Sequence, residues 1–425
     1  DPVSAKAHAR IVAMRSAKRA KVRIVEGEKR GRADRSRPAR RWLLRATRQP
    51  GRPGPLQSTA DATFAVLPFL TETPMNAPDS IPLRLTSFSH GGGCGCKIAP
   101  GVLRDILAGT GAGVIPPQLL VGIETADDAA VYQINETQAI VATTDFFMPI
   151  VDDPFDFGAI AATNAISDIY AMGGTPLFAL ALVGMPVDKL PVGTIRRILE
   201  GGEAVCARAG IPIGGGHTID SVEPIYGLVA IGIVDPRHLK RNAGARAGDR
   251  LVLGKPIGVG IYSAALKKDR LDAAGYAAMI ASTTQLNTPG MALGAMPGVH
   301  ALTDVTGFGL AGHLLEICRA SNAAAILDFA AIPLHPGVTD LAAAGVFTGA
   351  STRNWTGYGD AVGIAAGLPP AAQVLLTDPQ TSGGLLAACA PEAVDDVLAV
   401  FRAAGFGRAA VIGEIVAGEP RVEVR

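Results

Sequence analysis

Residues 138–172 read QAIVATTDFFMPIVDDPFDFGAIAATNAISDIYAM. The first part, Gln138–Thr144, is short and rich in β-branched and apolar residues, as strands are. The second part, Phe157–Met172, has apolar residues at helical spacing and is followed by Gly173, a common stop for a helix. The stretch therefore predicts a strand followed by a helix, the basic unit of an α/β protein.

The same alternation continues on both sides of this stretch. A second helical pattern covers Val192–Ala209, and a second strand-like segment covers Pro224–Val234. A polar, basic stretch at residues 236–249 interrupts the pattern, which then resumes. The elements expected in this second part are a strand-like segment at Leu251–Val259, a helix near Gly309–Ala320, and strands at Ala325–Phe329 and Ala410–Glu414. We therefore expect an α/β (α+β) fold with two domains, residues 78–240 and 241–425.

Residues 1–77 differ from the rest of the chain in composition. From residue 1 to 74, 17 Lys and Arg face 6 Asp and Glu, a net charge of +11; the remainder holds 39 − 17 = 22 against 38 − 6 = 32, a net −10. Such a segment cannot bury enough apolar surface to offset its ordering entropy, so we expect a disordered basic extension. The acidic body argues against nucleic acid as the main partner, because phosphate contacts need a positive surface.

Three interpretations of the basic extension stay open: a transit peptide, a nucleic-acid-binding arm, or upstream sequence from an overextended reading frame. The extension begins with Asp1, whereas Met75 stands just before the first globular pattern. We favour the third interpretation.

Cysteine usage and hydropathy indicate the compartment. The chain has five cysteines, an odd number without framework spacing, which suits a reducing cytoplasm better than secretion. No run of about 18 apolar residues appears, so the sequence predicts no membrane-spanning helix. We expect a soluble, cytoplasmic protein.

The densest local feature is HGGGCGCKIAP at His90–Pro100. It is not a Walker A loop, because Cys96 precedes Lys97 and Ile98 follows it. Glycines alone would indicate a flexible solvated loop, but a lysine beside Cys94 and Cys96 can lower a thiol pKa, which favours a reactive cysteine. No second pair of ligands at finger-like spacing follows, so the sequence does not favour a structural zinc site.

Several aspartates stand at expected strand ends and helix faces. A single Asp at such a place is more often a turn former or a helix cap than a ligand. Asp168 is different, because it lies inside a helical pattern among apolar neighbours. A carboxylate in such surroundings would be stabilised by a cation. Carboxylates that share a cation with substrate phosphates are how proteins hold Mg²⁺. The candidates are Asp127, Asp128, Asp145, Asp168 and Asp304.

Glycine-rich turns form a third group of candidates. They are Gly214–Thr218, Thr306–Gly309 and Thr381–Gly384. Turns of this kind bind anions where backbone N–H groups face outward at a helix start. Each is a weak signal alone, and His217 by itself reads as a hydrogen-bonded structural residue.

Together these segments resemble the selenophosphate synthetase family, also called selenide, water dikinase. The resemblance runs from about Leu83 to the C-terminus, and its most specific element is the Cys-Gly-Cys-Lys sequence. The aspartate and glycine motifs are shared with a wider group similar to aminoimidazole ribonucleotide synthetase, which includes thiamine-phosphate kinase. The motifs are SHGGGCGCKIAP from Ser89, ETADDAAVY from Glu124, TTDFFMPIVDDPFDFG from Thr143, AATNAISDIYAMGG from Ala161, GGGHTID from Gly214, LTDVTGFG from Leu302 and DPQTSGGLL from Asp378.

The resemblance implies a reaction and a set of roles. Selenide would receive the γ-phosphoryl group of ATP, and the remaining ADP would be hydrolysed to AMP and phosphate, with selenophosphate supplying selenium for selenocysteine and selenouridine. The fold implied is two α/β domains, the first pairing with its copy in a homodimer to form a β-barrel. The residues implied are Cys94 and Lys97 for catalysis; Asp128, Asp168 and Asp304 for Mg²⁺; and Lys97, Thr125, Ala126, Asp127, Asp128, Asp145, Asp168, Gly216, His217 and Thr218 for ATP.

Two alternatives stay open from the sequence. Another ATP-dependent enzyme of the wider group, such as a thiamine-phosphate kinase, would use the same aspartates but leaves the Cys-Gly-Cys-Lys sequence unexplained. A nucleic-acid-binding protein would act through the basic extension, against the acidic charge of the body.

Overall fold

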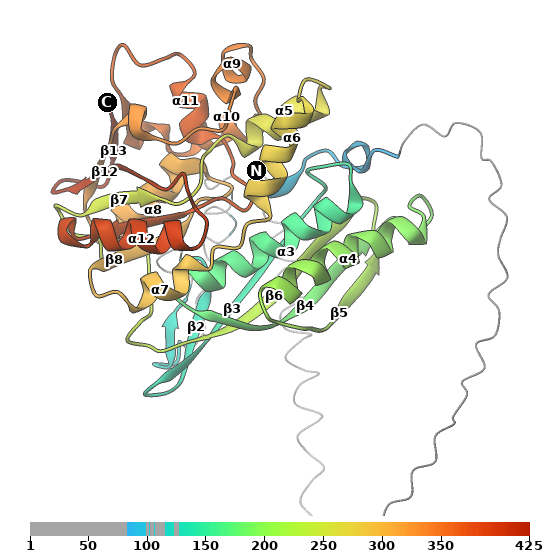
Figure 1. Cartoon of the computed structure of the whole chain (residues 1–425), viewed down its shortest axis with the longest axis horizontal. Helices are drawn as coiled ribbons and strands as arrows, with labels where there is room; N and C mark the ends of the chain where they lie inside the picture. Colours follow the sequence, from blue (N-terminus) through green and yellow to red (C-terminus); the bar gives the residue numbers. More distant parts are fainter. Residues whose placement is uncertain (1–82, 99–101, 103–105, 107–114, 123–126) are drawn as a thin grey trace, which may run out of the picture. The chain divides into compact units, whose positions relative to one another are not determined.

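The computed structural model describes residues 83–98, 102, 106, 115–122 and 127–425, and the basic extension, Thr125 and Ala126 lie outside them. Within this part of the chain two β-sheets follow each other in sequence, and helices pack on both (Figure 1). The mixture confirms the expected α/β character.

The first sheet has six strands in the order β1-β2-β3-β6-β4-β5. Helices α3 and α4 lie on the same face of it (Figure 1), and their apolar side chains bury that face. Pro at the first turn and Asp153, whose side chain accepts from the backbone of Asp156, start α3. The bounds are β1 Leu119–Val121, β2 Ala130–Asn135, β3 Gln138–Phe147, α3 Pro154–Ala171, β4 Thr175–Met185, α4 Val192–Arg208, β5 Ile213–Asp220 and β6 Ile225–Val234.

The other face of this sheet carries no helix among the described residues. Inward side chains of β3, such as Val141 and Phe147, are buried, whereas Ile140 and Phe146 on the outward side are exposed. Strand β5 is exposed along nearly its whole length, and Ile219 within it is 55% exposed. A sheet face this apolar normally lies against another surface.

The second sheet has seven strands in the order β10-β13-β9-β12-β7-β11-β8, and helices cover both of its faces. Helix α8 packs on one face through a core that includes Leu314 and Leu386, while α7 and α12 pack on the other through a core that includes Leu293 and Phe401. The strands are β7 Arg250–Leu253, β8 Val299–Asp304, β9 Ala324–Leu327, β10 Val362–Ile364, β11 Leu385–Cys389, β12 Ala410–Val416 and β13 Val422–Val424.

The remaining elements complete the second half and the N-terminal loop. The helices of the second half are α5 Val259–Lys267, α6 Ala273–Thr283, α7 Pro289–Ala295, α8 Gly309–Ser321, α9 Val338–Ala343, α10 Gly349–Tyr358, α11 Ala372–Thr377 and α12 Val394–Ala403. Single 3₁₀ turns are η1 Leu85–Phe88, η2 Gly93–Cys96, η3 Phe329–Ala331, η4 Gly359–Ala361 and η5 Pro391–Ala393.

Most of the expected elements are confirmed, with two corrections. The strand expected at Leu251–Val259 ends at Leu253 as β7, and Val259 is the first residue of helix α5. The expected helices at residues 157–172 and 192–209 correspond to α3 and α4, and the expected strands at 138–144 and 224–234 correspond to β3 and β6. Gly214–Thr218, expected as an anion-binding turn, lies inside strand β5 instead. Its glycines adopt backbone angles such as φ 145° at Gly215, and the flanking Ile213 and Ile219 continue the pairing with β4.

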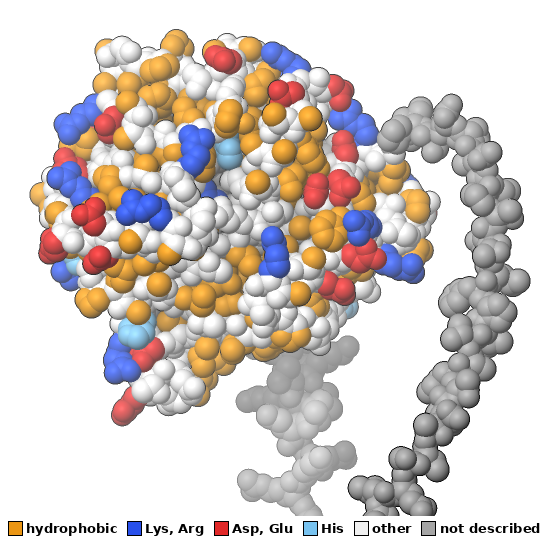
Figure 2. All heavy atoms as spheres, in the orientation of Figure 1, with side chains coloured by type: hydrophobic (Ala, Val, Ile, Leu, Met, Phe, Trp, Pro, Cys, Tyr) orange, Lys and Arg blue, Asp and Glu red, His pale blue; other side chains and the backbone are white. Residues whose placement is uncertain are grey.

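Two further segments refine the expectation. Thr306–Gly309 leads directly into helix α8, as expected for a turn at a helix start, whereas Thr381–Gly384 leads into strand β11. No helix within the described ranges is long and apolar enough to cross a membrane. Figure 2 shows both signs of charge scattered over the face that carries α3, α4 and α12.

Helices α3 and α4 approach so closely that glycine is required between them. A Cβ at Gly201 would lie 2.0 Å from the carbonyl oxygen of Phe155, and one at Gly158 would lie 1.8 Å from that of Ile198. Helix α3 is therefore held against both the sheet and α4, which fixes the direction of its polar side chains.

The contact predicts opposite effects for one substitution at two positions of α4. Gly201→Ala forces the helices apart and should lower the free energy of unfolding by about 1–3 kcal/mol. Gly193→Ala, where a Cβ meets no atom within 4 Å, should raise it by about 0.5–1 kcal/mol because alanine loses less entropy in a helix. Denaturant unfolding of both variants measures the difference. Equal effects would contradict the close packing.

Candidate active site

The inner surface between strand β3 and helix α3 is polar at one place. Thr143 and Asp145 point inward from β3, and Asn164 and Asp168 point toward them from α3, one helical turn apart. The hydroxyl of Thr143 donates to Asp168 Oδ2 at 2.5 Å, and Asn164 Nδ2 donates to Asp145 Oδ2 at 2.5 Å. The sheet and the helix thus hold two carboxylates in fixed orientations.

Strand β8 brings a third carboxylate to the same region. Asp304 ends β8 and accepts a hydrogen bond from the hydroxyl of Ser167 on α3. The neighbouring Thr303 donates to Asp128 Oδ1 at 2.9 Å, which ties the segment before β2 to β8. Three of the sequence-predicted metal ligands, from three separate elements, therefore converge.

The pKa values of these carboxyl groups are raised, in part because the carboxylates repel one another. Burial, followed by repulsion from Asp304 and Asp168, raises the pKa of Asp128 well above its usual value. Burial, followed by repulsion from Asp304 and Asp145, likewise raises the pKa of Asp168. The pKa of Asp304 is also raised, first by burial, although the Ser167 hydroxyl opposes the shift. Buried carboxylates that repel one another in this way are stabilised by binding a proton or a cation.

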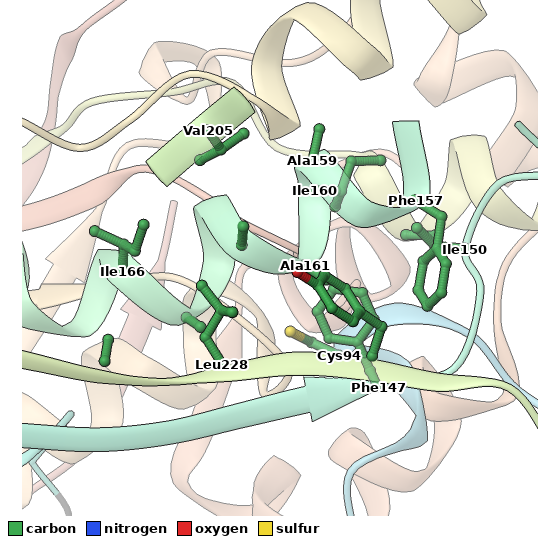
Figure 3. Packing of buried hydrophobic residues seen from close by; sticks show 14 of the residues in the cluster. Cys94, Phe147, Ile150, Phe157, Ala159, Ile160, Ala161, Ile166, Val205 and Leu228 are labelled. Carbon is green, nitrogen blue, oxygen red and sulfur yellow. The ribbon is translucent and has the colours of Figure 1, made fainter. Parts of the chain in front are cut away.

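The glycine loop that carries Cys94 lies against this cluster. Gly93 has φ 56°, and a Cβ there would lie 2.3 Å from Thr381 Oγ1, so only glycine fits. The backbone N–H of Cys94 donates to the same Thr381 oxygen at 3.0 Å, and its thiol donates to Asn164 Oδ1 at 3.2 Å. Figure 3 shows the Cys94 side chain among the buried hydrophobic residues of α3 and Phe147.

Lys97 joins the loop to the carboxylates. Its ammonium lies 3.1 Å from Asp145 Oδ2, and its side chain is 40% exposed. Burial opposes the charged form, but the attraction of Asp145 and Asp168 prevails, so the pKa of Lys97 is raised well above its usual value. The lysine is a fixed positive charge at the border between the acidic cluster and solvent.

The structure corrects the expectation that Lys97 lowers the pKa of a neighbouring thiol, here Cys94. Burial raises the pKa of this thiol well above its usual value, and the attraction of Lys97 is too small to reverse the effect. Burial raises the pKa of Cys96 as well, and its thiol donates to the carbonyl of Gly93 at 2.7 Å. In this arrangement of the loop, Cys94 is a neutral thiol covered by the protein.

The DPQTSGGLL segment, which begins at Asp378, holds Asn164 and Lys255 through hydrogen bonds to the backbone of Ser382. The backbone N–H of Ser382, a residue with φ 52°, donates to Asn164 Oδ1 at 2.7 Å, and its carbonyl accepts from Lys255 Nζ at 2.9 Å. Lys255 is fully buried, which lowers its pKa to about 7. Asn287 Nδ2 donates to Ser167 Oγ at 2.7 Å, and so orients the hydroxyl that binds Asp304.

A cavity of about 510 Å³ opens on the solvent side of Lys97 and Asp145. A smaller one of about 240 Å³ continues along the outward face of the first sheet to His217, and Phe146 and Ile225 line both. The two form a groove with charged groups at one end and apolar walls along the rest. This is the distribution of polarity found in sites for small organic ligands.

Not all of the sequence-predicted residues come together within one chain. Asp145, Leu228, Ala181 and Gly216 pair in one row across β3, β6, β4 and β5, so Gly216 lies three strand spacings, or about 14 Å, from Asp145. Asp127 Oδ1 accepts from the backbone N–H of Asn242 at 2.6 Å. The predicted nucleotide contacts at Thr125 and Ala126 fall outside the described residues.

Sequence reasoning did not identify several polar residues that orient the site. They are Thr143, Asn164, Ser167, Lys255, Asn287 and Thr303. The signal for two of them was present: Asn164 and Ser167 are polar residues inside a helix that is otherwise apolar, on the same side as Asp168. The others are recognisable only from their contacts.

The cluster fits Mg²⁺ in chemistry. Its donors are carboxylate and hydroxyl oxygens, the ligands that this ion prefers, and repulsion between the carboxylates would be relieved by a divalent cation. Among the described residues no three Asp, Glu, His or Cys side chains already surround a single point. Such an open set suits an ion that takes part of its ligands from substrate phosphates.

Comparison with known proteins identifies the family. Residues 126–234 match the family model "AIR synthase related protein, N-terminal domain", and residues 246–425 match "AIR synthase related protein, C-terminal domain". The chain is 68% identical over 352 residues to the selenide, water dikinase of Paraburkholderia xenovorans (strain LB400), covering 83% of this chain and 99% of that relative. It is 57% identical over 341 residues to the selenide, water dikinase of Rhizobium meliloti (strain 1021), covering 80% and 98%.

Solved structures share the fold at much lower identity. The thiamine-monophosphate kinase of Stenotrophomonas maltophilia K279a superposes with a TM-score of 0.54 at 21% identity, over 76% of this chain and 95% of that one. The hydrogenase maturation protein HypE in complex with ATP gives 0.52 at 20% identity, over 71% and 82%. With the sequence match to curated relatives over four fifths of its length, the chain belongs to the selenide, water dikinase family of AIR synthase related proteins.

Proposed function

We propose that this protein makes selenophosphate from selenide, consuming ATP and water and releasing AMP and phosphate. The observation that carries the proposal is the position of Lys97, 3.1 Å from Asp145 in a loop that also carries Cys94, beside a cluster of buried carboxylates. Its relatives at 57–68% identity have the name selenide, water dikinase. A thiamine-phosphate kinase, the alternative from the sequence, would leave Cys94 and its contact with Asn164 without a role.

The protein residues act mainly by position and charge. Asp128, Asp168 and Asp304 would hold Mg²⁺, which when bound neutralises triphosphate oxygens and orients the terminal phosphoryl group. Lys97 would exchange its contact with Asp145 for a phosphate oxygen, because its side chain borders the 510 Å³ cavity. Near neutral pH selenide is present as the HSe⁻ anion, which is a strong nucleophile, so no general base is needed.

The groove along the outward face of the first sheet would receive the rest of the nucleotide. Gly227 lies in the same row as Phe146 and Leu182 and contributes no side chain, which leaves room between the two cavities. Apolar walls at Phe146, Ile225 and Ile219 would bind the base and ribose, and His217 closes the far end. ATP would then span from Lys97 to strand β5.

A homodimer would cover the apolar outward face and complete this site. Ile140, Leu177 and Ile219 are 37%, 46% and 55% exposed on it, and β5 has both faces open. Closing the open six-stranded sheet against a second copy would form the β-barrel expected from the resemblance. Since Gly216 lies about 14 Å from Asp145 in one chain, Gly216–Thr218 would border the far end of the nucleotide groove rather than the triphosphate.

A cytoplasmic location agrees with the cysteines. All five are free, and Cys94 and Cys96 stand two residues apart without forming a disulfide. Thiols in this state suit a reducing compartment.

Product analysis by phosphorus NMR tests the proposed reaction. The full chain with ATP, Mg²⁺ and selenide should give selenophosphate, AMP and phosphate, whereas ADP formed only with a thiamine substrate would favour the alternative. Cys94→Ser should reduce selenophosphate at least about 100-fold while ATP still binds. Cys206→Ser, the same change at a buried position of α4, serves as the control and should leave the products unchanged.

The raised carboxylate pKa values predict a gain in stability on removing one charge. A folded Asp with a raised pKa binds its proton more tightly than the unfolded chain, so the free energy of unfolding falls as pH rises from the ordinary Asp value through the raised one. At pH 8 without metal, Asp168→Asn should therefore raise Tm, by about 2–4 °C for each kcal/mol recovered, and abolish activity.

Scanning calorimetry checks this expectation against two references. The control Asp188→Asn, at an exposed position, should change Tm by less than about 1 °C, as surface substitutions do. Addition of Mg²⁺ and ATP should raise the Tm of the parent protein by more than it raises the Tm of the Asp168→Asn variant. A lower Tm for metal-free Asp168→Asn would show that the carboxylate is not under repulsion.

The exposed sheet face predicts the effect of a charge on assembly. Ile140→Arg should raise the dimer dissociation constant about tenfold or more, because an unpaired charge would be buried at the interface. Val192→Arg is the control, since Val192 is exposed on α4, on the opposite side of the sheet. Sedimentation equilibrium measures both. A monomer in the parent protein at every concentration would remove the homodimer from the proposal.

A further inference from the structure

A second cavity lies on the other side of the glycine loop. It has a volume of about 600 Å³, and Cys96, Lys97 and Ile98 line both this cavity and the 510 Å³ cavity that borders Asp145. These three residues are therefore the wall between the two. Its opposite side is formed by the end of helix α5 and the start of helix α10.

The start of helix α10 carries hydrogen-bond donors that have no acceptor among the described residues. Thr348 is the N-cap of this ten-residue helix, but its side chain makes no capping hydrogen bond. Its hydroxyl is buried and has no hydrogen-bond partner among the described residues. Gly349 and Ala350, the first residues of the helix, line the cavity together with Thr348. A helix N-terminus and an unpartnered hydroxyl beside a cavity favour an anion there.

Two of the cations that line this cavity donate to carbonyls of the glycine loop. Lys267, at the end of α5, donates to the carbonyl of Gly91 at 3.3 Å, and Arg353 Nη2 donates to that of Gly95 at 2.8 Å. Neither forms an ion pair with a carboxylate of the described chain. Burial lowers the pKa of Lys267, as expected for a cation whose loss of hydration is not repaid by a close anion. Both side chains have further N–H donors to offer.

The remaining lining of the cavity carries no negative charge. None of its described lining residues is Asp or Glu, and His90, which also lines it, already pairs with Glu223 at 3.0 Å. Lys97 at the dividing wall and Lys268 at the end of α5 add two more positive charges. An anion entering here would meet cations and helix N–H groups without repulsion from a lining carboxylate.

We propose that this cavity binds the hydrogen selenide anion, the nucleophile of the reaction, on the side of the glycine loop opposite to the nucleotide. The inference rests on the proposed function. The anion would be held by Lys267, Arg353 and the Thr348 hydroxyl, with the sulfur of Cys96 as a soft neighbour for selenium. A shift of Cys96, Lys97 and Ile98 would then bring the two substrates together.

Steady-state kinetics with selenide and ATP varied separately test the binding role. Lys267→Gln keeps a donor for the Gly91 carbonyl but removes the charge, so KM for selenide should rise about tenfold, while KM for ATP and kcat at saturating selenide stay within about twofold. Lys267→Arg should restore most of the affinity. Arg270→Gln, three residues further along and exposed, removes a charge outside the cavity and should change nothing.

Thr348→Val gives an independent test. The hydroxyl makes no hydrogen bond among the described residues, so its removal breaks no contact and should not lower Tm. KM for selenide should nevertheless rise about threefold to tenfold if the hydroxyl donates to the anion. A lower Tm with unchanged KM would mean that the hydroxyl serves the fold, and would overturn its part in the site.

The outcomes separate failure of this inference from failure of the proposed function. If the parent protein makes no selenophosphate, the function itself is wrong. If it does, and Lys267→Gln changes only KM for ATP or kcat, the cavity does not bind selenide. If Lys267→Gln weakens inhibition by added orthophosphate but leaves KM for selenide unchanged, the cavity belongs to the phosphate product, which also contradicts the proposal.

Discussion

Repulsion between buried carboxylates is the constraint on which the rest of this structure depends. Asp128, Asp168 and Asp304 come from three elements, and each has a pKa raised by burial. The fold keeps them together by giving each a hydroxyl, from Thr303, Thr143 and Ser167. These contacts orient the acids without neutralising them, so the site retains a need for positive charge. Lys97 meets part of that need from the solvent side.

Asn164 connects the acidic cluster to the thiol loop. Its amide donates to Asp145 and accepts from both the Cys94 thiol and the backbone of Ser382. The loop is further held at Gly91, Gly95 and His90 by side chains from α5, α10 and the β5–β6 connection. If Lys97 releases Asp145, the change would therefore be transmitted to Cys94 through a single residue, Asn164, which contacts both. The buried, neutral state of that thiol describes the loop in its docked position.

The sequence predicted the fold well where the periodic pattern was long. Helices α3 and α4 and strands β3 and β6 were expected close to their observed bounds, because their apolar residues follow the spacing of a helix or of a strand. Gly214–Thr218 was misread as a turn, because three glycines look like a turn when the strand that pairs with them is not known. The expected acidic cluster appears, but the support from Ser167, Asn287 and Lys255 depends on contacts between residues over 80 positions apart. The expected lowering of a thiol pKa by Lys97 did not allow for the burial of Cys94, which no local pattern reveals.

Manganese binding followed by electron paramagnetic resonance tests the central claim most directly. The account predicts that Mn²⁺, in place of Mg²⁺, binds together with a non-hydrolysable ATP analogue and shows coupling to phosphorus. Replacing Asp128, Asp168 or Asp304 singly by Asn should weaken that binding at least about tenfold, since each supplies one of the shared charges. Unchanged affinity in all three variants would show that the carboxylates meet only to build the fold, and would contradict the account.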